Sequence, residues 1–321
     1  MKQPNRFLQH AGVTVPVICG AMYPCSNPEL IAAVSEAGGL GVIQPVSLTF
    51  VHGYELRAGI QKIRTLTQKP LGFNVLTESS VKFYQKKMEA WLQIALEEGI
   101  RFFITALGDP GWVVKQVKPL GGMVYHDLTE RKYALKVADK VDGFICVNNR
   151  AGGHAGLRSA EELYADLADL NKPLICAGGI GNAADYKRAL AIGYEGVQMG
   201  TRFIATRECT AHEDYKKAIL NATEKDIVIT DRVTGVSLSV IKTPYLEKIG
   251  IRAGPLARFF LKGRHTKHFM RFLFSMQSLF KLKNSNFKPL STKDYWQAGK
   301  SVASIEKIES AGDIVRSFAQ E

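Results

Sequence analysis

The chain has 321 residues, of which 46% are hydrophobic and 22% are charged, and this composition excludes a disordered, collagen-like or coiled-coil protein. Its net charge of +12 comes from 42 Lys and Arg residues against 30 Asp and Glu residues, but the excess is local. Eleven of the basic residues and no acidic residue lie between Lys248 and Lys293, so the rest of the chain carries only +1. We call this stretch the basic segment. Its charge does not indicate a protein-wide nucleic-acid-binding surface.

The cysteines are scattered and lack the paired spacing of a metal site, so we expect reduced thiols, no bound metal and a cytoplasmic protein. They are Cys19, Cys25, Cys146, Cys176 and Cys209. The first twelve residues have no continuous apolar core, and no apolar run approaches the ~18 residues that cross a membrane. We therefore expect neither a signal peptide nor a transmembrane helix.

Short apolar runs alternate with longer stretches of helical period, which predicts βα units and a parallel sheet. The runs are continuous in Val, Ile, Leu and Phe, as is typical of strands covered on both faces. Eight such units in about 220 residues predict a (β/α)8 TIM barrel, whose active site lies on the loops after the strands. The predicted strands are Val15 to Cys19, Leu40 to Gln44, Leu71 to Leu76, Arg101 to Thr105, Met123 to His126, Gly143 to Val147, Leu174 to Ala177 and Gly196 to Met199.

The first clear helix is predicted from Asn27 to Ala37, with Asn27 as N-cap, Pro28 in the first turn and Gly38 after the end. The glycines from 38 to 41 could suggest a doubly wound dinucleotide-binding sheet instead. That alternative fails because these glycines close a helix and precede a strand, whereas the dinucleotide fingerprint follows a strand and opens a helix.

After Cys209 the pattern changes to a helix at 212–222, a strand at 226–230, the basic segment and a final helix at 301–318. We expect one large domain with an appendage: a barrel of residues 1–222 and about 297–321, and a basic, aromatic-rich helical cap of about 223–296. Within the basic segment an apolar helical face is predicted. Its members are Phe269, Phe272, Leu273, Met276, Leu279 and Phe280.

Two glycine-containing loops follow the seventh and eighth predicted strands, at Gly178-Gly179 and at Gly200-Thr201. Glycines let backbone N–H groups approach phosphate oxygens, and these loops are where barrels bind phosphate. The alternative is two tight turns that need a positive φ. Because the two loops lie on adjacent strands, we favour a phosphate-bearing ligand.

His154 lies among glycines directly after the sixth predicted strand. An imidazole there can take or give a proton at physiological pH, and the flanking glycines leave room for a planar ligand. A solvated loop histidine is the alternative, but the position at the end of a barrel strand favours a catalytic role.

Six stretches stand in order along the chain: GAM at 20–22, AAVSEAGGLG at 32–41, GFN at 72–74, AGGHAG at 151–156, AGGI at 177–180 and GVQMGTRFIAT at 196–206. Together they resemble the nitronate monooxygenase family, formerly called 2-nitropropane dioxygenases. The resemblance covers about residues 12–222, with a weaker likeness near the C-terminal helix. The same superfamily contains NAD(P)H:quinone reductases and flavin-dependent enoyl reductases.

The resemblance implies an FMN-containing TIM barrel with His154 beside the flavin, as a base on nitroalkanes or a partner of the anionic nitronate. It implies the phosphate at the two glycine loops, the flavin ring over the first and third strands, and Gln198 near the ribityl chain. The implied FMN-binding residues are Ala21, Met22, Asn74, Gly152, Gly153, Ala177, Gly178, Gly179, Gln198, Met199, Gly200 and Thr201.

Two departures from the family pattern bear on the substrate and not on FMN. The stretch from Ile104 to Pro110 replaces a Ser-Phe-His-Phe-Gly-like motif and is more similar to the quinone-reductase branch. Where the family has Gln-Gly-x-Glu, this chain has Val-Asn-Asn-Arg, which introduces Arg150 as a candidate substrate residue. His126 could partly replace the missing histidine, or it could be a capping or core imidazole.

The basic segment allows three interpretations. Packing of its apolar face on the barrel mouth or across a homodimer interface is favoured, with the charges solvated. Attraction of an anionic ligand comes next, and contact of residues 255–283 with a membrane surface is third. Nucleic-acid binding is not expected because no recognised motif accompanies the charge.

These patterns predict an FMN-dependent oxidoreductase that acts on a small molecule, with oxidative denitrification of alkyl nitronates by dioxygen as the favoured reaction. The alternative on the same scaffold is an NAD(P)H-dependent flavin reductase acting on quinones or an enoyl thioester. The two reactions differ in the electron donor, which is the organic substrate in the first and NAD(P)H in the second.

Overall fold

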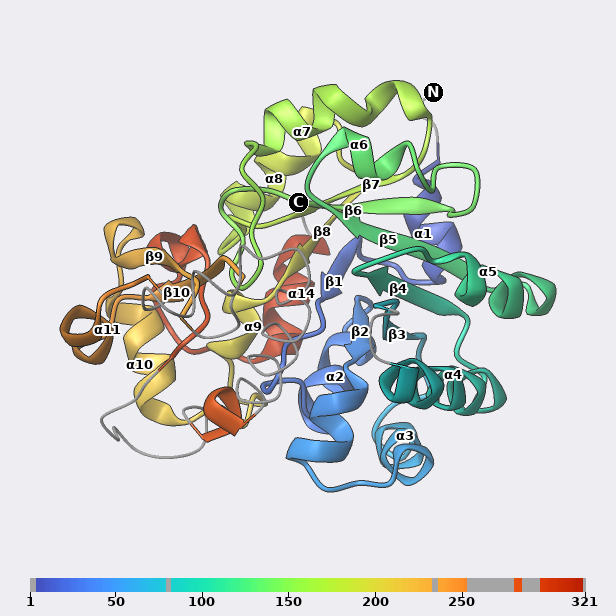
Figure 1. The fold of residues 1–321 in the computed structure, drawn as a ribbon, viewed down its shortest axis with the longest axis horizontal. Helices are drawn as coiled ribbons and strands as arrows, with labels where there is room; N and C mark the ends of the chain where they lie inside the picture. The colour runs from blue at the N-terminus through green and yellow to red at the C-terminus, as the bar shows by residue number, and fades with distance from the viewer. Residues whose placement is uncertain (1–3, 79–81, 233–235, 253–279, 285–294, 320–321) are drawn as a thin grey trace.

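The computed structural model describes residues 4–78, 82–232, 236–252, 280–284 and 295–319, and it confirms the (β/α)8 barrel (Figure 1). All barrel strands are parallel and each pairs with its neighbour in sequence, while β8 pairs with β1 to close the barrel. The eight strands are β1 Val17–Cys19, β2 Leu40–Ile43, β3 Leu71–Leu76, β4 Phe102–Ala106, β5 Met123–Leu128, β6 Gly143–Val147, β7 Leu174–Ala177 and β8 Gly196–Met199. Every predicted strand is present, with ends shifted by at most two residues.

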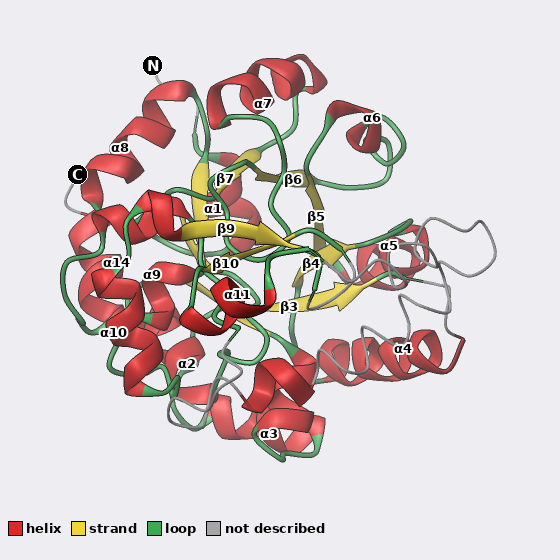
Figure 2. Cartoon of the chain, turned by 60° about the vertical axis from the view of Figure 1, so that its left-hand side comes forward, coloured by secondary structure: helices red, strands yellow, loops and turns green. Residues whose placement is uncertain are grey.

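Helices surround the strands in a ring (Figure 2). They cover the outer face of the sheet, which explains why the strands are apolar on both faces. In chain order the helices along the barrel are α2 Pro28–Glu36, α3 Leu56–Arg64, α4 Lys82–Glu97, α5 Gly111–Val117, α6 Arg131–Ala134, α7 Ala160–Leu167, α8 Ala183–Ile192 and α9 Thr201–Ile204.

The predicted first helix is confirmed as α2, but its cap differs from the prediction. Asn27 occupies the N-cap position without a side-chain capping bond. Its buried amide instead donates to the Glu29 carboxylate at 2.8 Å and to the Glu208 carbonyl at 2.9 Å. The Asn27 side chain therefore makes hydrogen bonds to other groups in place of the capping bond that the local sequence predicts.

Helix α1 (Arg6–Ala11) covers the end of the barrel opposite the strand C-termini. Phe7 is fully buried and meets Phe102 edge to face, with ring centroids 5.8 Å apart. Arg6 pairs with Glu195, which precedes β8. This end is therefore filled with apolar side chains, and the open end is the one at which the strands finish.

Strand alternation separates two layers of core. One apolar cluster fills the barrel interior with residues such as Ile18, Ile104, Tyr125 and Ile145. A larger cluster lies between the sheet and the helices and takes the alternate residues of the same strands. A strand residue's parity therefore tells whether its side chain faces the barrel interior or the helices.

A small cap rises from the open end of the barrel. Strands β9 (Ile227–Thr230) and β10 (Leu238–Ile241) form an antiparallel pair, preceded by helix α10 (Glu213–Asn221) and followed by α11 (Pro244–Ile249). The pair, with α11, lies at one end of the barrel in both views (Figures 1 and 2). The predicted helix at 212–222 and strand at 226–230 are confirmed, whereas β10 was not predicted.

The predicted final helix at 301–318 is wrong in its middle. The structure has a 3-10 helix at Lys300–Ser304 and a separate helix α14 at Ala311–Ala319. The intervening residues are extended because Glu309 pairs with Thr206 in a β-bridge and binds the buried Arg202 guanidinium at 2.6 Å. These contacts override the local helical pattern.

Most of the basic segment, including nearly all of the predicted apolar face, lies outside the described residues. The part at 280–284 packs on the barrel, where the Phe280 ring meets Phe50 edge to face at 5.3 Å. Lys283 lies over the same Phe50 ring and donates to the Phe50 carbonyl at 2.8 Å. Within the described residues, no helix is long and apolar enough to cross a membrane.

The close approach of α2 to β2 gives a test of the packing. A Cβ atom on Gly41 would overlap the backbone carbonyl of Ile31, so we expect Gly41→Ala to lower the free energy of unfolding by ~3 kcal/mol. Gly312→Ala is the control, because a Cβ there meets only the flexible end of Arg316 and alanine favours the helix. Urea denaturation of both variants measures the difference, and equal stabilities would contradict the packing argument.

Candidate functional site

The loops after β6, β7 and β8 meet at the open end of the barrel, where the segment 295–300 crosses them. The Lys300 N–H donates to the Arg150 carbonyl at 2.9 Å, and the Gly299 N–H donates to the Thr201 hydroxyl oxygen at 3.0 Å. The Ser239 hydroxyl of β10 donates to the Ala298 carbonyl at 3.0 Å. One short segment therefore ties the cap to the loops that the sequence singled out.

Asn148, directly after β6, holds two of these loops together. It is fully buried, and its amide nitrogen donates to the Gly178 carbonyl at 3.0 Å. Its amide oxygen accepts the Arg150 N–H at 2.8 Å. Asn148 stands at a departure from the family motif, and the structure shows that it fixes the loop after β7 against the loop that carries His154.

The two glycine loops present backbone N–H groups that have no acceptor. Among the described residues, the N–H groups of Gly178, Gly179, Gly200 and Thr201 make no hydrogen bond. Gly178 and Gly179 have φ values of +117° and +82°, which L side chains rarely adopt. Because β7 pairs with β8, the two sets of N–H groups are neighbours. This arrangement suits an anion with several acceptor oxygens.

Gly152 and Gly153 serve the contact between loop and cap. A Cβ atom on Gly152 would lie 2.8 Å from the Gly299 nitrogen. Gly153 forms a bridge with Ser239, in which the Gly153 N–H donates at 3.2 Å and the Ser239 N–H donates back at 2.7 Å. Both glycines allow close backbone approach, and their contact with a cofactor stays a prediction.

His154 follows these glycines at the barrel mouth. The residue is exposed and makes no hydrogen bond with the described residues. The loss of hydration lowers the pKa of His154 below its usual value of 6.5. At pH 7 the ring is therefore neutral, with one nitrogen as acceptor and the other as donor.

The residues expected around a flavin ring lie on the other side of the mouth. Asn74 is buried on β3 and donates to the Ile104 carbonyl at 3.3 Å, while Ala21 packs on the interior cluster. The Met22 sulfur lies 3.4 Å from the Cβ position of Gly200. The side-chain oxygen of Gln198 on β8 is buried without a hydrogen-bond partner in the described part of the chain. A buried amide oxygen without a donor indicates a place for a ligand N–H or O–H.

Three predicted site residues differ in how they face the interior. Ala177 packs in the interior cluster, whereas Met199 points outward into the layer beneath the helices, so only its backbone borders the mouth. His126 alternates with the interior residue Tyr125 and also faces outward, where its Nδ1 contacts the Thr105 hydroxyl at 2.8 Å. Burial lowers the pKa of His126 to about 4. His126 therefore has the surroundings of a neutral core imidazole.

Asp127 is a further candidate site residue, which the sequence patterns did not single out. It follows Tyr125 by two positions on β5, so its carboxyl faces the barrel interior at the open end. One carboxyl oxygen is buried without a partner among the described residues, and burial raises the pKa of Asp127 to about 7. An acid inside a buried strand was the available signal, because such a residue is costly unless it serves a function.

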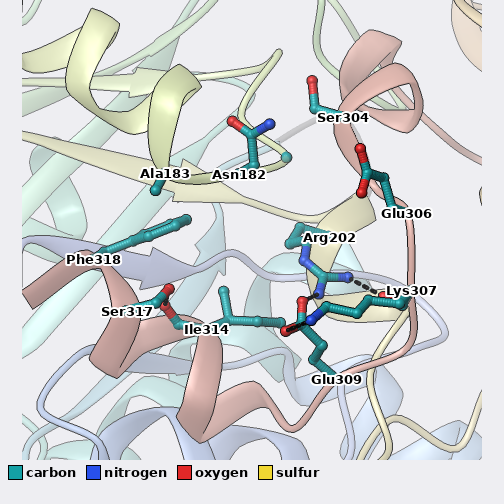
Figure 3. A pocket seen from close by; sticks show the side chains of 11 residues that line it. Asn182, Ala183, Arg202, Ser304, Glu306, Lys307, Glu309, Ile314, Ser317 and Phe318 are labelled. Carbon is teal, nitrogen blue, oxygen red and sulfur yellow. Dashed lines mark hydrogen bonds and ion pairs between the residues drawn. The ribbon is translucent and has the colours of Figure 1, made fainter.

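A cavity of about 200 Å³ lies behind the β7 loop and not at the barrel mouth (Figure 3). It is bounded by Asn182 at the start of α8, by Arg202 and by Phe318 of α14. Its two cationic residues, Arg202 and Lys307, both pair with Glu309. This cavity lies between the start of α8 and α14, and we assign it no ligand.

A closed parallel barrel with polar groups and unbonded N–H groups gathered at the strand C-termini is the architecture of a barrel enzyme. Comparison with known proteins then specifies the class. The family model "Nitronate monooxygenase" matches residues 5–321. The chain belongs to the nitronate monooxygenase family, and it is therefore an oxidoreductase of a family of FMN-dependent enzymes.

Individual relatives span several reactions. A carboxyl-CoA dehydrogenase of Rhodococcus jostii, named for a hydroxy-methyl-oxo-octahydroindene substrate, is 30% identical over 74% of this chain, which spans 65% of that relative's length. A probable nitronate monooxygenase of Staphylococcus saprophyticus is 27% identical over 78% of this chain and 81% of its own. The solved structure of FabK from Thermotoga maritima has a TM-score of 0.78 at 27% identity and covers 98% of this chain and 96% of its own.

The buried carboxyl of Asp127 predicts an unusual dependence of stability on pH. The folded state keeps a proton up to a pKa of about 7, whereas the unfolded chain loses it near 4, so stability falls as the pH rises from about 4 to about 7. At ~1.4 kcal/mol per pKa unit, we expect Asp127→Asn to raise the free energy of unfolding by roughly 2–4 kcal/mol at pH 8 and to change it little at pH 4.

Urea denaturation at the two pH values measures this effect. Asp109→Asn is the control, because a hydrogen bond from Lys140 lowers the pKa of that exposed carboxyl and the sign is reversed. A variant Asp127→Asn that is less stable than the parent at pH 8 would show that the ionised carboxylate is stabilised in the fold.

Proposed function

We propose that this protein oxidises alkyl nitronates, or the parent nitroalkanes, to a carbonyl compound and nitrite with FMN and dioxygen. The observation that carries the proposal is the position of His154. A neutral imidazole stands at the barrel mouth on the loop after β6, and Asn148 ties that loop to the glycine loop after β7. The probable nitronate monooxygenase of Staphylococcus saprophyticus, similar over 78% of this chain, supports the same reaction.

The residues present fit FMN. The unbonded N–H groups of Gly178, Gly179, Gly200 and Thr201 suit its phosphate, and the unpartnered Gln198 oxygen suits a hydroxyl of the ribityl chain or an N–H of the ring. Ala21, Met22 and Asn74 border the place proposed for the ring. When bound, FMN supplies the redox chemistry, accepting electrons from the organic substrate and passing them to dioxygen.

The protein's own contribution is to position the substrate and to handle one proton. The neutral His154 nitrogen can accept the proton from the carbon next to a nitro group. With a substrate that is already an anionic nitronate, the N–H of the same ring can donate a hydrogen bond to its oxygens. Partial desolvation of the ring, which lowers its pKa, also strengthens either interaction.

A second candidate is reduction by NAD(P)H of a quinone or an enoyl thioester. The Rhodococcus jostii relative is named as a dehydrogenase of a carboxyl-CoA compound, which supports a thioester. The loop after β4 also favours this reaction, because Leu107 has a φ of +62° and is 56% exposed where many family members carry a histidine motif. Backbone strain at an exposed apolar residue on the mouth is typical of a functional contact.

The chain divides into a barrel and a cap in the arrangement that we propose, and we propose a cytoplasmic location for the protein. We propose a barrel of residues 1–222 and about 297–321 and a cap of 223–296. The cap has its own apolar cluster, which includes Leu238, Val240 and Leu246. All five cysteines are buried and none of them forms a disulfide, which supports a reducing, cytoplasmic location.

The electron donor separates the two candidate reactions. We expect anaerobic mixing of the FMN-loaded protein with propionate 3-nitronate to bleach the flavin absorbance rapidly, and NADH or NADPH to leave it unchanged. Stopped-flow absorbance measures both. Rapid bleaching by NAD(P)H with an inert nitronate would assign the protein to the reductase branch.

His154→Ala tests the proton transfer. We expect it to retain FMN and to slow flavin reduction by a neutral nitroalkane by about 10² to 10⁴, the range of a positioned base. Because desolvation lowers the pKa of His154, the parent rate should rise with pH through an inflection below 6.5 and then stay level. Reduction by the preformed nitronate should be slowed less, since it needs no base. An unchanged rate with the nitroalkane would end the catalytic role of His154.

A further inference from the structure

The Arg150 side chain lies over the glycine loop that follows β7. A Cβ atom on Gly179 would be 2.8 Å from Arg150 Nε and 2.9 Å from its Cδ. Two backbone contacts fix the base of the side chain, because the Arg150 N–H binds the Asn148 side chain and its carbonyl accepts the Lys300 N–H. The guanidinium is therefore held beside the unbonded N–H groups of this loop.

The guanidinium of Arg150 is only partly paired. Its two terminal nitrogens both bind the Glu224 carboxylate, one of them at 3.2 Å. Its Nε is buried and has no acceptor among the described residues. A buried guanidinium N–H without an acceptor is unfavourable, and a ligand oxygen beside Gly179 would remove that cost.

The charge at the loop points to the same acceptor. Backbone N–H groups contribute partial charges, whereas a phosphate monoester carries nearly two negative charges at pH 7. A charge-assisted hydrogen bond from a guanidinium is about twice as strong as one from a neutral donor. Arg150 is placed to supply that bond while Glu224 keeps the planar group in orientation.

We propose that Arg150 binds the phosphate of the cofactor through its Nε, as a charged partner to the glycine loops, with Glu224 as the positioning residue. The inference rests on the proposed FMN site and assigns to it a contact from a different loop. Glu224 opens the 3-10 helix Glu224–Asp226 that leads into β9. The phosphate is therefore linked through Arg150 and Glu224 to the cap.

Comparison of FMN with riboflavin tests the assignment, because the two differ only in the phosphate. Apoprotein is titrated with each ligand, and quenching of the ligand's fluorescence gives Kd. We expect Arg150→Ala to weaken FMN binding by about 10- to 100-fold, the effect of one charge-assisted hydrogen bond, and riboflavin binding by less than about threefold. The preference for FMN over riboflavin should fall accordingly.

Arg158→Ala is the matched control, since Arg158 lies on the same loop after β6 but pairs with Asp166. It should leave the preference for FMN unchanged. If the Arg150→Ala apoprotein unfolds, Arg150→Lys replaces it. That variant keeps the charge and a partner for Glu224 but has no N–H at the Nε position, and we expect a loss of FMN preference of about fivefold or more.

The outcomes separate the two proposals. A parent protein that binds FMN no better than riboflavin would contradict the phosphate site itself. A parent that strongly prefers FMN, together with an Arg150 variant that keeps the whole preference, would overturn the role of Arg150 and leave the glycine loops as the phosphate site.

Discussion

Pairing of β8 with β1 closes the barrel and thereby fixes where each of its loops lies. Val17 lies opposite Val197 and Cys19 opposite Met199, so the first and last thirds of the barrel sequence become neighbours. Because every barrel strand is parallel, all eight loops that follow these strands open on one face. The opposite end is filled by Phe7 and its aromatic partners, which leaves one face for chemistry.

The loops on that face are positioned mainly by close backbone–backbone contacts and less by pairing of side chains. Gly152 lets the loop after β6 touch the segment at Gly299, and Gly153 pairs with β10 of the cap. Asn148 joins the loops after β6 and β7 from beneath. These contacts order the surroundings of His154 without using its imidazole, so the ring remains available to a substrate.

The same face carries buried polar groups that have no hydrogen-bond partner within the described residues. The Asp127 carboxyl, the Gln198 amide oxygen and the Arg150 Nε each have a buried polar atom without a partner in the described residues. Each lies in or beside the barrel mouth, on β5, on β8 and on the loop after β6. Unsatisfied buried groups cost stability, and their concentration at one end of a barrel agrees with a site that ligands complete.

The amino-acid pattern alone was enough to predict the barrel and the loops at its candidate site. Apolar runs of strand length with helical stretches between them leave few alternatives to a closed parallel sheet, and local glycines mark the turns at 178–179 and 200–201. It could not determine orientation or pairing, which arise between residues distant in the chain. Only the tertiary structure turned His126 outward and Asp127 inward, since strand parity depends on register. The tertiary structure also paired Arg150 with Glu224, which lies 74 positions away in the chain. It divided the predicted C-terminal helix in two, because packing energies exceed local helix propensity.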